Sequence, residues 1–420
     1  MSTPASVLIV GGGTFGTSTA YYLSQNPTAY KSITVLDPFP IPGPETAGND
    51  LNKVIRADYP DAIYGSLANE AINLWSDPEG MYKGLYHRCG WFYASGGDSL
   101  DFITTASDTA RKLGLELPQP VTAEEVRSKF PVFKGTMEGW KTVWNSSAGW
   151  ANAGGALQRM AEAAERNGAR YITGDAGNVK QLLFDENGRC VGAKVADGTA
   201  HFADLVILAA GANAASIIDF KGQLVAKGHG VGHIQLTPEE AKKYADMPIV
   251  THLEGGLVFP PQEDNIIKIG ADHFLTNFAS SGVSLPRYRS YNPSDEALGI
   301  PAPVEKHLRR FLGEILPELA EREWSDTRIC WDADMPDYHF LIGKHPAHDG
   351  LHLAVGGSAH GFKFLPVLGK YVVQSIEGSL DNRMAAKWRW RPGASLEGPC
   401  PHVTPLIELS EIPGWEPTKS

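Results

Sequence analysis

Wholly apolar runs recur along the chain and predict the strands of one buried parallel sheet. The first, at 6–10, is mostly β-branched, and the helical segment 17–23 follows it closely. Similar runs lie at 33–36, 205–210 and 351–355, far apart in the sequence. Because parallel strands need crossover connections, this pattern predicts an α/β sheet that the chain leaves and rejoins twice.

The intervening segments have a different pattern, which predicts a second domain. Short aromatic and alternating strands are expected at 91–93, 233–236, 257–259 and 266–269, and an amphipathic helix at 304–316. The predicted fold class is therefore α/β (α+β), with a Rossmann-like nucleotide-binding domain and a mixed-sheet substrate domain. The predicted parts are 1–89, 150–222 and 325–380 for the first domain, 90–149 and 223–324 for the second, and 381–420 for a C-terminal tail that wraps over a domain surface.

The spacing Gly11-x-Gly13-x-x-Gly16 directly after the first strand predicts a dinucleotide site. Gly11 permits a tight turn, Gly13 lets a pyrophosphate approach the backbone, and Gly16 lets helix and strand pack closely. Asp37 ends the second strand about 20 residues after Gly16, where an acid accepts from a ribose hydroxyl. A Gly-rich turn alone is weak evidence among 45 glycines, but the flanking strands and the acid supply its context.

Composition and charge exclude several functions. The chain has 420 residues, 42% hydrophobic and 20% charged, with a net charge of −11, which argues against a nucleic-acid partner. No apolar run approaches membrane-spanning length, and residues 417–420 are not a Ser-Lys-Leu peroxisomal signal. Cys89, Cys190, Cys330 and Cys400 show neither disulfide nor metal spacing, so we expect a cytoplasmic protein without a metal site.

Several reactive side chains stand out, although each also has an ordinary structural interpretation. Lys53 and Arg56 could be a solvated basic pair, and Lys363 a solvated lysine in a glycine-flanked turn. Cys330, expected to follow a helix and open an acidic, aromatic turn, could be an inert buried thiol. Lys268 differs, because a lysine on a strand bounded by apolar residues is costly to bury without a function.

Three segments together resemble one family of flavoenzymes. They are Asn49-Asp50-Leu51-Asn52-Lys53, Cys330-Trp331-Asp332-Ala333-Asp334-Met335-Pro336-Asp337 and Gly357-Ser358-Ala359-His360-Gly361-Phe362-Lys363-Phe364. The chain resembles the FAD-dependent amine oxidases that include monomeric sarcosine oxidase, pipecolate and saccharopine oxidases, and the fungal fructosyl amino acid oxidases (amadoriases). The resemblance extends from Val7 to Trp-Arg-Trp-Arg-Pro at 388–392 and Pro-Gly-Trp at 413–415.

The resemblance implies a role for each reactive residue. Cys330 would carry a thioether to the 8α-methyl group of FAD. Arg56 and Lys363 would bind the substrate carboxylate. Arg391, which falls where amadoriases keep a carboxylate-binding arginine, would bind it too. Lys268 would lie over the flavin and help oxygen accept electrons by stabilising developing negative charge. At the position where sarcosine oxidases carry tyrosine, this chain has Asp332, and amadoriases also have aspartate there.

The resemblance also implies a cofactor site and a reaction. Hydride would pass from a carbon beside the substrate nitrogen to FAD, oxygen would become hydrogen peroxide, and the imine would hydrolyse. A monomer acting on a small amino acid and O₂ is expected. A flavin dehydrogenase with another acceptor and an inactive flavin-binding protein remain alternatives. The residues expected to bind FAD are Gly11, Gly13, Thr14, Phe15, Gly16, Asp37, Asn49, Lys53, Val179, Cys330, Asp332, Gly357, Gly361, Phe362 and Lys363.

Two departures from the amadoriases bear on the substrate. Amadoriases carry Phe-Glu-Pro before the strand lysine, and the glutamate contacts sugar hydroxyls; here the matching residues are Phe259-Pro260-Pro261. Losing that contact would cost a polyhydroxylated substrate about ten- to a hundredfold in affinity. Arg56 stands where amadoriases have an apolar residue. We therefore expect saccharopine, pipecolate or an N-methyl amino acid as substrate, with fructosyl amino acids as the alternative.

Overall fold

The computed structural model describes residues 6–97, 99–262, 264–278, 282–288, 299–399 and 406–415. Cys400 and residues 417–420 lie outside these ranges. Within them Cys89, Cys190 and Cys330 are free thiols, no helix offers the length of apolar sequence that crossing a membrane requires, and no group of three or more potential ligands is arranged to hold a metal ion.

A six-stranded sheet brings together the apolar runs that the sequence scatters over the whole chain. Its strands are parallel except β19, which is antiparallel to β20. This confirms the expected buried α/β sheet, with β1 at its centre between β2 and β13. Across the sheet the order is β19 (Leu341–Lys344), β20 (Leu351–Val355), β13 (Leu205–Leu208), β1 (Ser6–Val10), β2 (Ser32–Leu36) and β9 (Arg170–Ile172).

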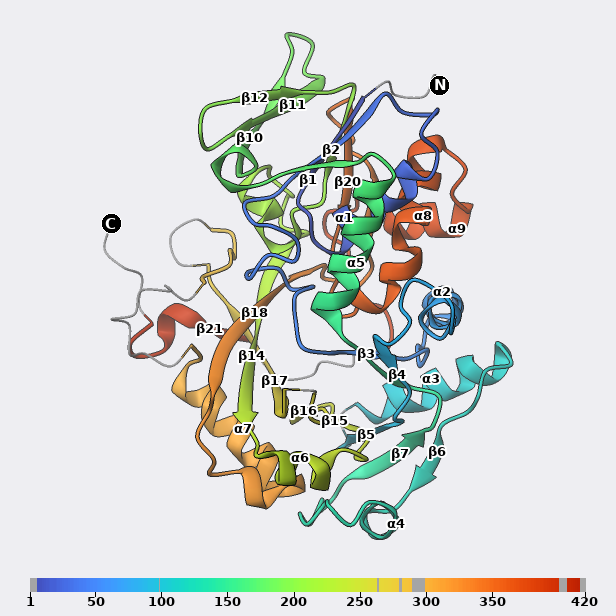
Figure 1. The fold of residues 1–420 in the computed structure, drawn as a ribbon, viewed down its shortest axis with the longest axis vertical. Helices are drawn as coiled ribbons and strands as arrows, with labels where there is room; N and C mark the ends of the chain where they lie inside the picture. Colours follow the sequence, from blue (N-terminus) through green and yellow to red (C-terminus); the bar gives the residue numbers. More distant parts are fainter. Residues whose placement is uncertain are drawn as a thin grey trace.

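Helix α1 (Thr14–Ser24) follows β1 and packs against both α5 (Ala153–Arg166) and α8 (Leu365–Glu377). The α1–α8 contact is close: a Cβ placed on Gly369 would lie 2.0 Å from the carbonyl oxygen of Ser18. Figure 1 shows these helices side by side at the end of the molecule that holds β1 and β20. The first and last helices of this domain are thereby held against one another, although the sequence between them is long.

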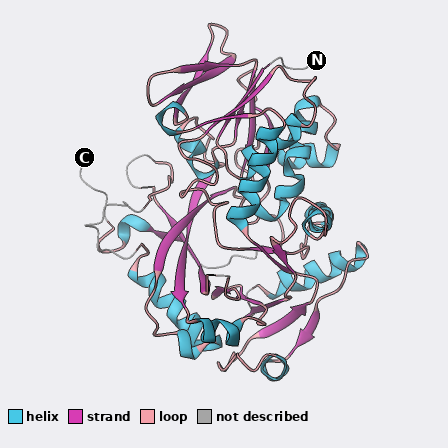
Figure 2. Ribbon diagram, viewed as in Figure 1, coloured by secondary structure: helices cyan, strands magenta, loops and turns pink. Residues whose placement is uncertain are grey.

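A second, mixed sheet forms the other half of the molecule, and its long strands β14, β17 and β18 run through the centre of the view in Figures 1 and 2. Helix α7 (Ala302–Ile315) covers it with a core of large apolar side chains, and β21 of the C-terminal tail pairs with β17. The order is β18 (Asp326–Asp334), β14 (Val225–Gln235), β17 (Ile266–Thr276), β16 (Gly256–Val258), β15 (Ile249–His252), β5 (Trp91–Ser95), β7 (Lys141–Asn145) and β6 (Gln119–Val121), with β21 at Leu406–Glu408.

Two small sheets, α7 with five further α-helices, and five short 3-10 helices complete the described part of the chain. One sheet contains β10 (Val179–Phe184), β11 (Cys190–Val195) and β12 (Ala200–Phe202), and the other β3 (Lys53–Ile55), β8 (Gly149–Ala151) and β4 (Tyr86–His87). The helices are α2 (Ala62–Trp75), α3 (Leu100–Lys112), α4 (Ala123–Lys129), α6 (Pro238–Tyr244), α7 (Ala302–Ile315) and α9 (Asn382–Trp388).

The predictions around Cys330 are wrong in two respects. Cys330 lies inside strand β18, paired with His229 of β14, rather than at the start of a turn. The acidic residues that indicated a turn have partners on the neighbouring strand: Asp332 lies 3.4 Å from the ring of His229, and Asp334 lies 3.3 Å from the ammonium group of Lys227. The domain boundary expected at residue 325 is also displaced. Strand β18 still belongs to the second sheet, and the chain rejoins the first sheet only at β19.

Candidate active site

The turn after β1 has the geometry that the glycine spacing predicts. Gly11 has a φ of +101°, and a Cβ there would lie 2.6 Å from the carbonyl oxygen of Ala209. A Cβ on Gly16 would lie 1.8 Å from the carbonyl oxygen of Gly11, so only glycine lets the helix begin this close to the strand. Helix α1 carries neither a side-chain cap nor an acidic residue in its first turn. Its N-terminus is therefore suited to an anionic group.

Asp37 is held at the end of β2 beside this turn. Its carboxylate accepts from the backbone N–H of Gly12 at 2.8 Å and from that of Phe39 at 2.9 Å. Burial raises the pKa of Asp37, and the two backbone donors partly offset that rise. A cavity of about 690 Å³ adjoins Asp37 and the glycine turn. Its size, the helix N-terminus and the buried acid fit the expected FAD.

Most residues expected to bind FAD line this first cavity, but four do not. Gly16 has a packing role in the turn, and the side chain of Asn49 donates to the carbonyl of Gly43 at 3.1 Å instead. Cys330 and Lys363 line the neighbouring cavity. The residues that line the first cavity as expected are Gly11, Gly13, Thr14, Phe15, Asp37, Lys53, Val179, Asp332, Gly357, Gly361 and Phe362.

A second cavity, of about 530 Å³, lies between the first one and the large sheet. Lys53, Asp332, Ala359 and Phe362 line both, so the two cavities meet at these residues. A cofactor that extends from the glycine turn to this junction would present its far end to the second cavity. The second cavity is accordingly the place for a substrate.

A buried carboxylate at the junction gathers three cations. Asp50, which the sequence analysis did not single out, lies 2.5 Å from Lys268, 3.2 Å from Lys53 and 3.3 Å from Arg328. Burial lowers the pKa of Lys268 to about 8, against the opposing effect of Asp50, whereas the three cations hold the pKa of Asp50 far below its usual range despite its burial. Lys268 also donates to the carbonyl of Asn52 at 2.8 Å.

Cys330 lies beside this cluster, with its sulfur 3.9 Å from the Nζ of Lys53. The thiol is buried, which raises its pKa, while the nearby Lys53 acts in the opposite direction. It faces the second cavity near the junction. This position lets the sulfur reach the end of a cofactor that enters from the first cavity.

Arg56 and Lys363 face the second cavity together. Lys363 is only 6% exposed, and among the described residues its one hydrogen-bond acceptor is the carbonyl of His360, at 2.9 Å. Burial, and next Arg56, lower its pKa well below the usual value. The Arg56 guanidinium stacks on the rings of Tyr59 and Trp91 and donates to the carbonyl of Asp58. Two adjoining cations of this kind favour an anionic ligand.

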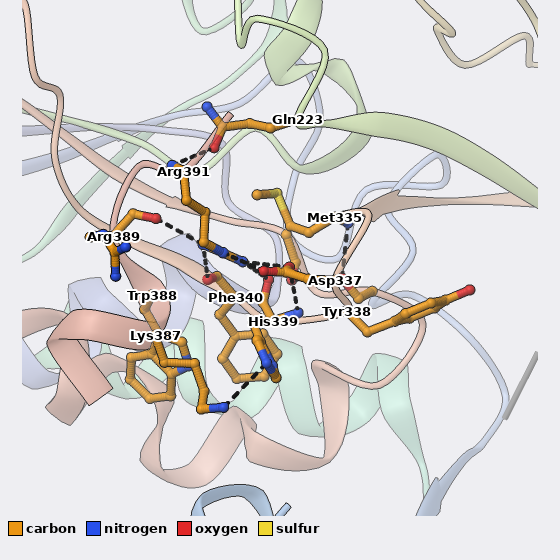
Figure 3. A network of polar contacts seen from close by, with 12 residues as sticks. Gln223, Met335, Asp337, Tyr338, His339, Phe340, Lys387, Trp388, Arg389 and Arg391 are labelled. Atoms are coloured by element: carbon orange, nitrogen blue, oxygen red, sulfur yellow. Dashed lines mark hydrogen bonds and ion pairs between the residues drawn. The ribbon is translucent and has the colours of Figure 1, made fainter. Parts of the chain in front are cut away.

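Arg391, expected to bind a carboxylate, lies elsewhere. Its guanidinium forms a bidentate pair with Asp337, at 2.5 and 2.7 Å, and its other donors meet three backbone carbonyls, those of His339, Phe340 and Arg389. Figure 3 shows this network around Asp337. Because these contacts occupy all five N–H bonds, the geometry gives Arg391 a structural place that tethers the C-terminal tail, and it leaves no donor for a substrate.

Asp50 and Arg328 are the polar residues that sequence reasoning missed at the junction. Asp50 was within reach of that reasoning, because it stands three residues before Lys53 in a segment that carried the family resemblance. Arg328 offered no local signal. Its place beside Asp50, and its hydrogen bond of 2.8 Å to the carbonyl of Asn49, depend on the pairing of β18 with β14.

Comparison with known proteins identifies relatives over nearly the whole chain. The family described as FAD dependent oxidoreductase matches residues 6–375. L-saccharopine oxidase from Schizosaccharomyces pombe is 35% identical, covering 92% of this chain and 93% of that protein. Monomeric sarcosine oxidase from Bacillus sp. strain NS-129 is 25% identical, over 89% and 93%. The structure of fructosamine oxidase (Amadoriase II) from Aspergillus fumigatus in complex with FSA has a TM-score of 0.89 and 33% identity, with 100% and 99% coverage.

Proposed function

This chain belongs to the FAD dependent oxidoreductase family, and we propose that it is an oxidase of amino acids whose amine nitrogen bears a second carbon substituent. The observation that carries the proposal is the pair Arg56 and Lys363 in the cavity that adjoins the expected FAD. A carboxylate between these cations would fix one end of an amino acid. The saccharopine and sarcosine oxidases among its relatives support an N-substituted amine at the other end.

The residues of this cavity would orient the substrate and adjust its charge. Arg56 and Lys363 would bind the carboxylate, so that the carbon beside the nitrogen lies near the junction of the two cavities. Arg56 and Lys363, beside which the substrate would lie, disfavour a protonated substrate amine and so favour the neutral amine that oxidation requires. FAD, when bound, supplies the chemistry: it accepts a hydride and delivers two electrons to oxygen. The resulting imine would hydrolyse in water.

Lys268 would serve the reaction with oxygen. Its ammonium group is buried in the second cavity and held by Asp50 and the carbonyl of Asn52. A cation fixed there would stabilise negative charge that develops on oxygen. Lys268→Met should therefore slow reoxidation by oxygen much more than reduction by substrate. Equal losses in the two half-reactions would contradict this role.

We propose that Cys330 carries the FAD covalently. Its sulfur lies beside Lys53 at the junction of the two cavities, where it can reach the cofactor. The mass of the denatured protein should exceed that of the chain by one FAD and return to the chain mass in Cys330→Ala. Complete release of flavin from the wild type by acid precipitation would contradict the linkage.

A panel of substrates tests the proposed activity. We expect peroxide formation with kcat/KM higher for saccharopine, pipecolate or an N-methyl amino acid than for fructosyl-valine. Oxidation of fructosyl amino acids is the second candidate, favoured by the structural likeness to Amadoriase II, and the highest kcat/KM for fructosyl-valine would establish it. Flavin bleaching without peroxide would indicate a dehydrogenase, and no bleaching with any substrate would indicate an inactive flavin protein.

The assembly and location of the protein are further proposals. A monomer is supported by the monomeric sarcosine oxidases among the relatives, and light scattering in solution would test it. A cytoplasmic location rests on cysteine usage alone, and fractionation of the source cells would test it.

A further inference from the structure

A second charged site lies in the substrate cavity, away from the pair Arg56 and Lys363. Lys387 of α9 has its Nζ 2.8 Å from a carboxylate oxygen of Asp61 and 3.2 Å from the Nε2 of His339. All three residues line the second cavity. Asp61 and Lys387 keep 28% and 25% of their side chains exposed, so a ligand can still reach them. Figure 3 shows Lys387 extended toward His339.

The three groups are held in place by contacts outside the cavity. The other oxygen of Asp61 caps α2 by accepting from the N–H of Ile63 at 2.8 Å. The ring of His339 stacks on that of Tyr64. Burial lowers the pKa of His339 to about 4, so its ring is neutral and Nε2 accepts a hydrogen bond from the ammonium group of Lys387. Trp388, next to Lys387, donates to the hydroxyl of Tyr64 at 3.1 Å. The site is therefore preorganised.

This arrangement retains hydrogen-bonding capacity. The ammonium group of Lys387 has three N–H bonds, and its contacts with described residues use two, those to Asp61 and His339. The oxygen of Asp61 that faces Lys387 has a second lone pair. A free α-amino acid head has the reverse pair of charges. Its ammonium group can bind Asp61 while its carboxylate binds Lys387, which closes a ring of alternating charges. A carboxylate alone would meet Asp61, and an ammonium group alone would meet Lys387.

A row of aromatic rings connects the two charged sites. Tyr59 contacts both Arg56 and Lys363 through its ring, at 4.8 and 5.4 Å. It also packs at a tilt against Tyr64, whose ring in turn stacks on His339. Methylene groups lying along these rings would join a carboxylate at one site to an amino acid head at the other. The cavity, at about 530 Å³, has room for such a substrate and is much larger than an N-methyl amino acid requires.

We propose that Asp61 and Lys387 form a subsite for the free α-amino acid head of an extended substrate. The substrate class is then a secondary amine that has a carboxylate near the nitrogen and, at the end of a methylene chain, an ammonium and a carboxylate on one carbon. Saccharopine has this structure and pipecolate lacks the second head. The subsite rests on the proposed function, since the amine between the two ends is the group that is oxidised.

Steady-state kinetics of the FAD-loaded enzyme with saccharopine and pipecolate test the subsite. Lys387→Met and Asp61→Asn should each raise KM for saccharopine about ten- to a hundredfold. The KM for pipecolate and both kcat values should stay within about twofold. Arg383→Met on the same helix is the matched control, because its partner is the exposed Asp381, and it should change nothing.

A substrate with one charge removed separates recognition from structure. N-(5-carboxypentyl)glutamate lacks only the second ammonium group, so Asp61→Asn should not raise its KM further. Equal losses for saccharopine and pipecolate, or no loss for either, would overturn the subsite. If the wild type does not oxidise saccharopine, the proposed function fails on that substrate, and calorimetric titration with saccharopine still decides the subsite. Binding to the wild type that Lys387→Met weakens would support it, and no binding or equal binding would overturn it.

Discussion

Asp50→Asn should impair the reaction with oxygen through its effect on Lys268. In the folded protein one buried carboxylate faces three cations, and Lys268 is the nearest at 2.5 Å. The pKa of Lys268, already lowered to about 8 by burial, falls further when this carboxylate is neutralised, because Lys53 and Arg328 remain as repelling charges. Lys268 in the variant should therefore be uncharged at a pH where the wild type still carries the proton.

The size of this effect follows from the separation. Two unit charges 2.5 Å apart attract by about 7 kcal/mol at an effective dielectric constant of about 20. If about 3 kcal/mol of that attraction stabilises the protonated form of Lys268 over the neutral form, its loss lowers the pKa of Lys268 by about two units. At pH 8 the protonated fraction then drops from about one half to about one in a hundred. The rate of reoxidation should fall roughly fiftyfold at pH 8 and recover to within a few-fold at pH 6.

Stopped-flow mixing of the substrate-reduced enzyme with oxygen across pH 5.5 to 9 measures this rate. Flavin content and melting temperature report whether the variant is folded and loaded, and the pH profile adds information that a purely structural defect would not alter. In a Lys268→Met background the Asp50→Asn substitution should add almost nothing, since its target is already absent. A loss that is the same at every pH, or that adds fully to that of Lys268→Met, would refute the reasoning.

Three further predictions concern other parts of the chain. An unreactive carboxylate such as acetate should bind with uptake of protons, because it raises the lowered pKa of Lys363; titration in weakly buffered solution measures the uptake, and Lys363→Met should abolish it. His352 is 1% exposed with a pKa lowered to about 3, so between pH 6.5 and about 3 only the unfolded chain binds its proton. The free energy of unfolding should therefore be about 2 kcal/mol lower at pH 5 than at pH 7.5 on account of this residue, a difference that urea denaturation of His352→Leu should lack. Gly369→Ala, whose Cβ would meet the backbone of α1, should destabilise the protein by about 1–3 kcal/mol. Gly313→Ala on α7, with open space around it, should instead stabilise the protein by about 0.5–1 kcal/mol. Thermal melts of the two variants test both changes.

Features that depend only on residues close together in the sequence could be predicted from the sequence. The strand, glycine turn and helix around Gly11, and the acid Asp37 at the end of the next strand, have the predicted geometry. The alternation of a strand and the spacing of a helix are local, and a turn that requires glycine is specified by the glycine itself. The dispersal of apolar strands along the chain was enough to predict one sheet to which the chain returns repeatedly. The structure has three returns rather than the predicted two, because the small sheet β10–β12 separates β9 from β13.

Partners that are distant in sequence were decided by tertiary structure alone. Asp50 and Lys268 meet because β17 carries the lysine to the junction of the two cavities, and nothing near either residue specifies the other. Cys330 lies in a strand rather than a turn because β18 pairs with β14 along its whole length, where Lys227 faces Asp334 and His229 lies beside Asp332. Arg391 is bound by Asp337, and Lys387 by Asp61, only once the tail has folded back over the domain. Charge pairing acts through space, so the composition of a segment reveals which charges it carries but not which charges they meet.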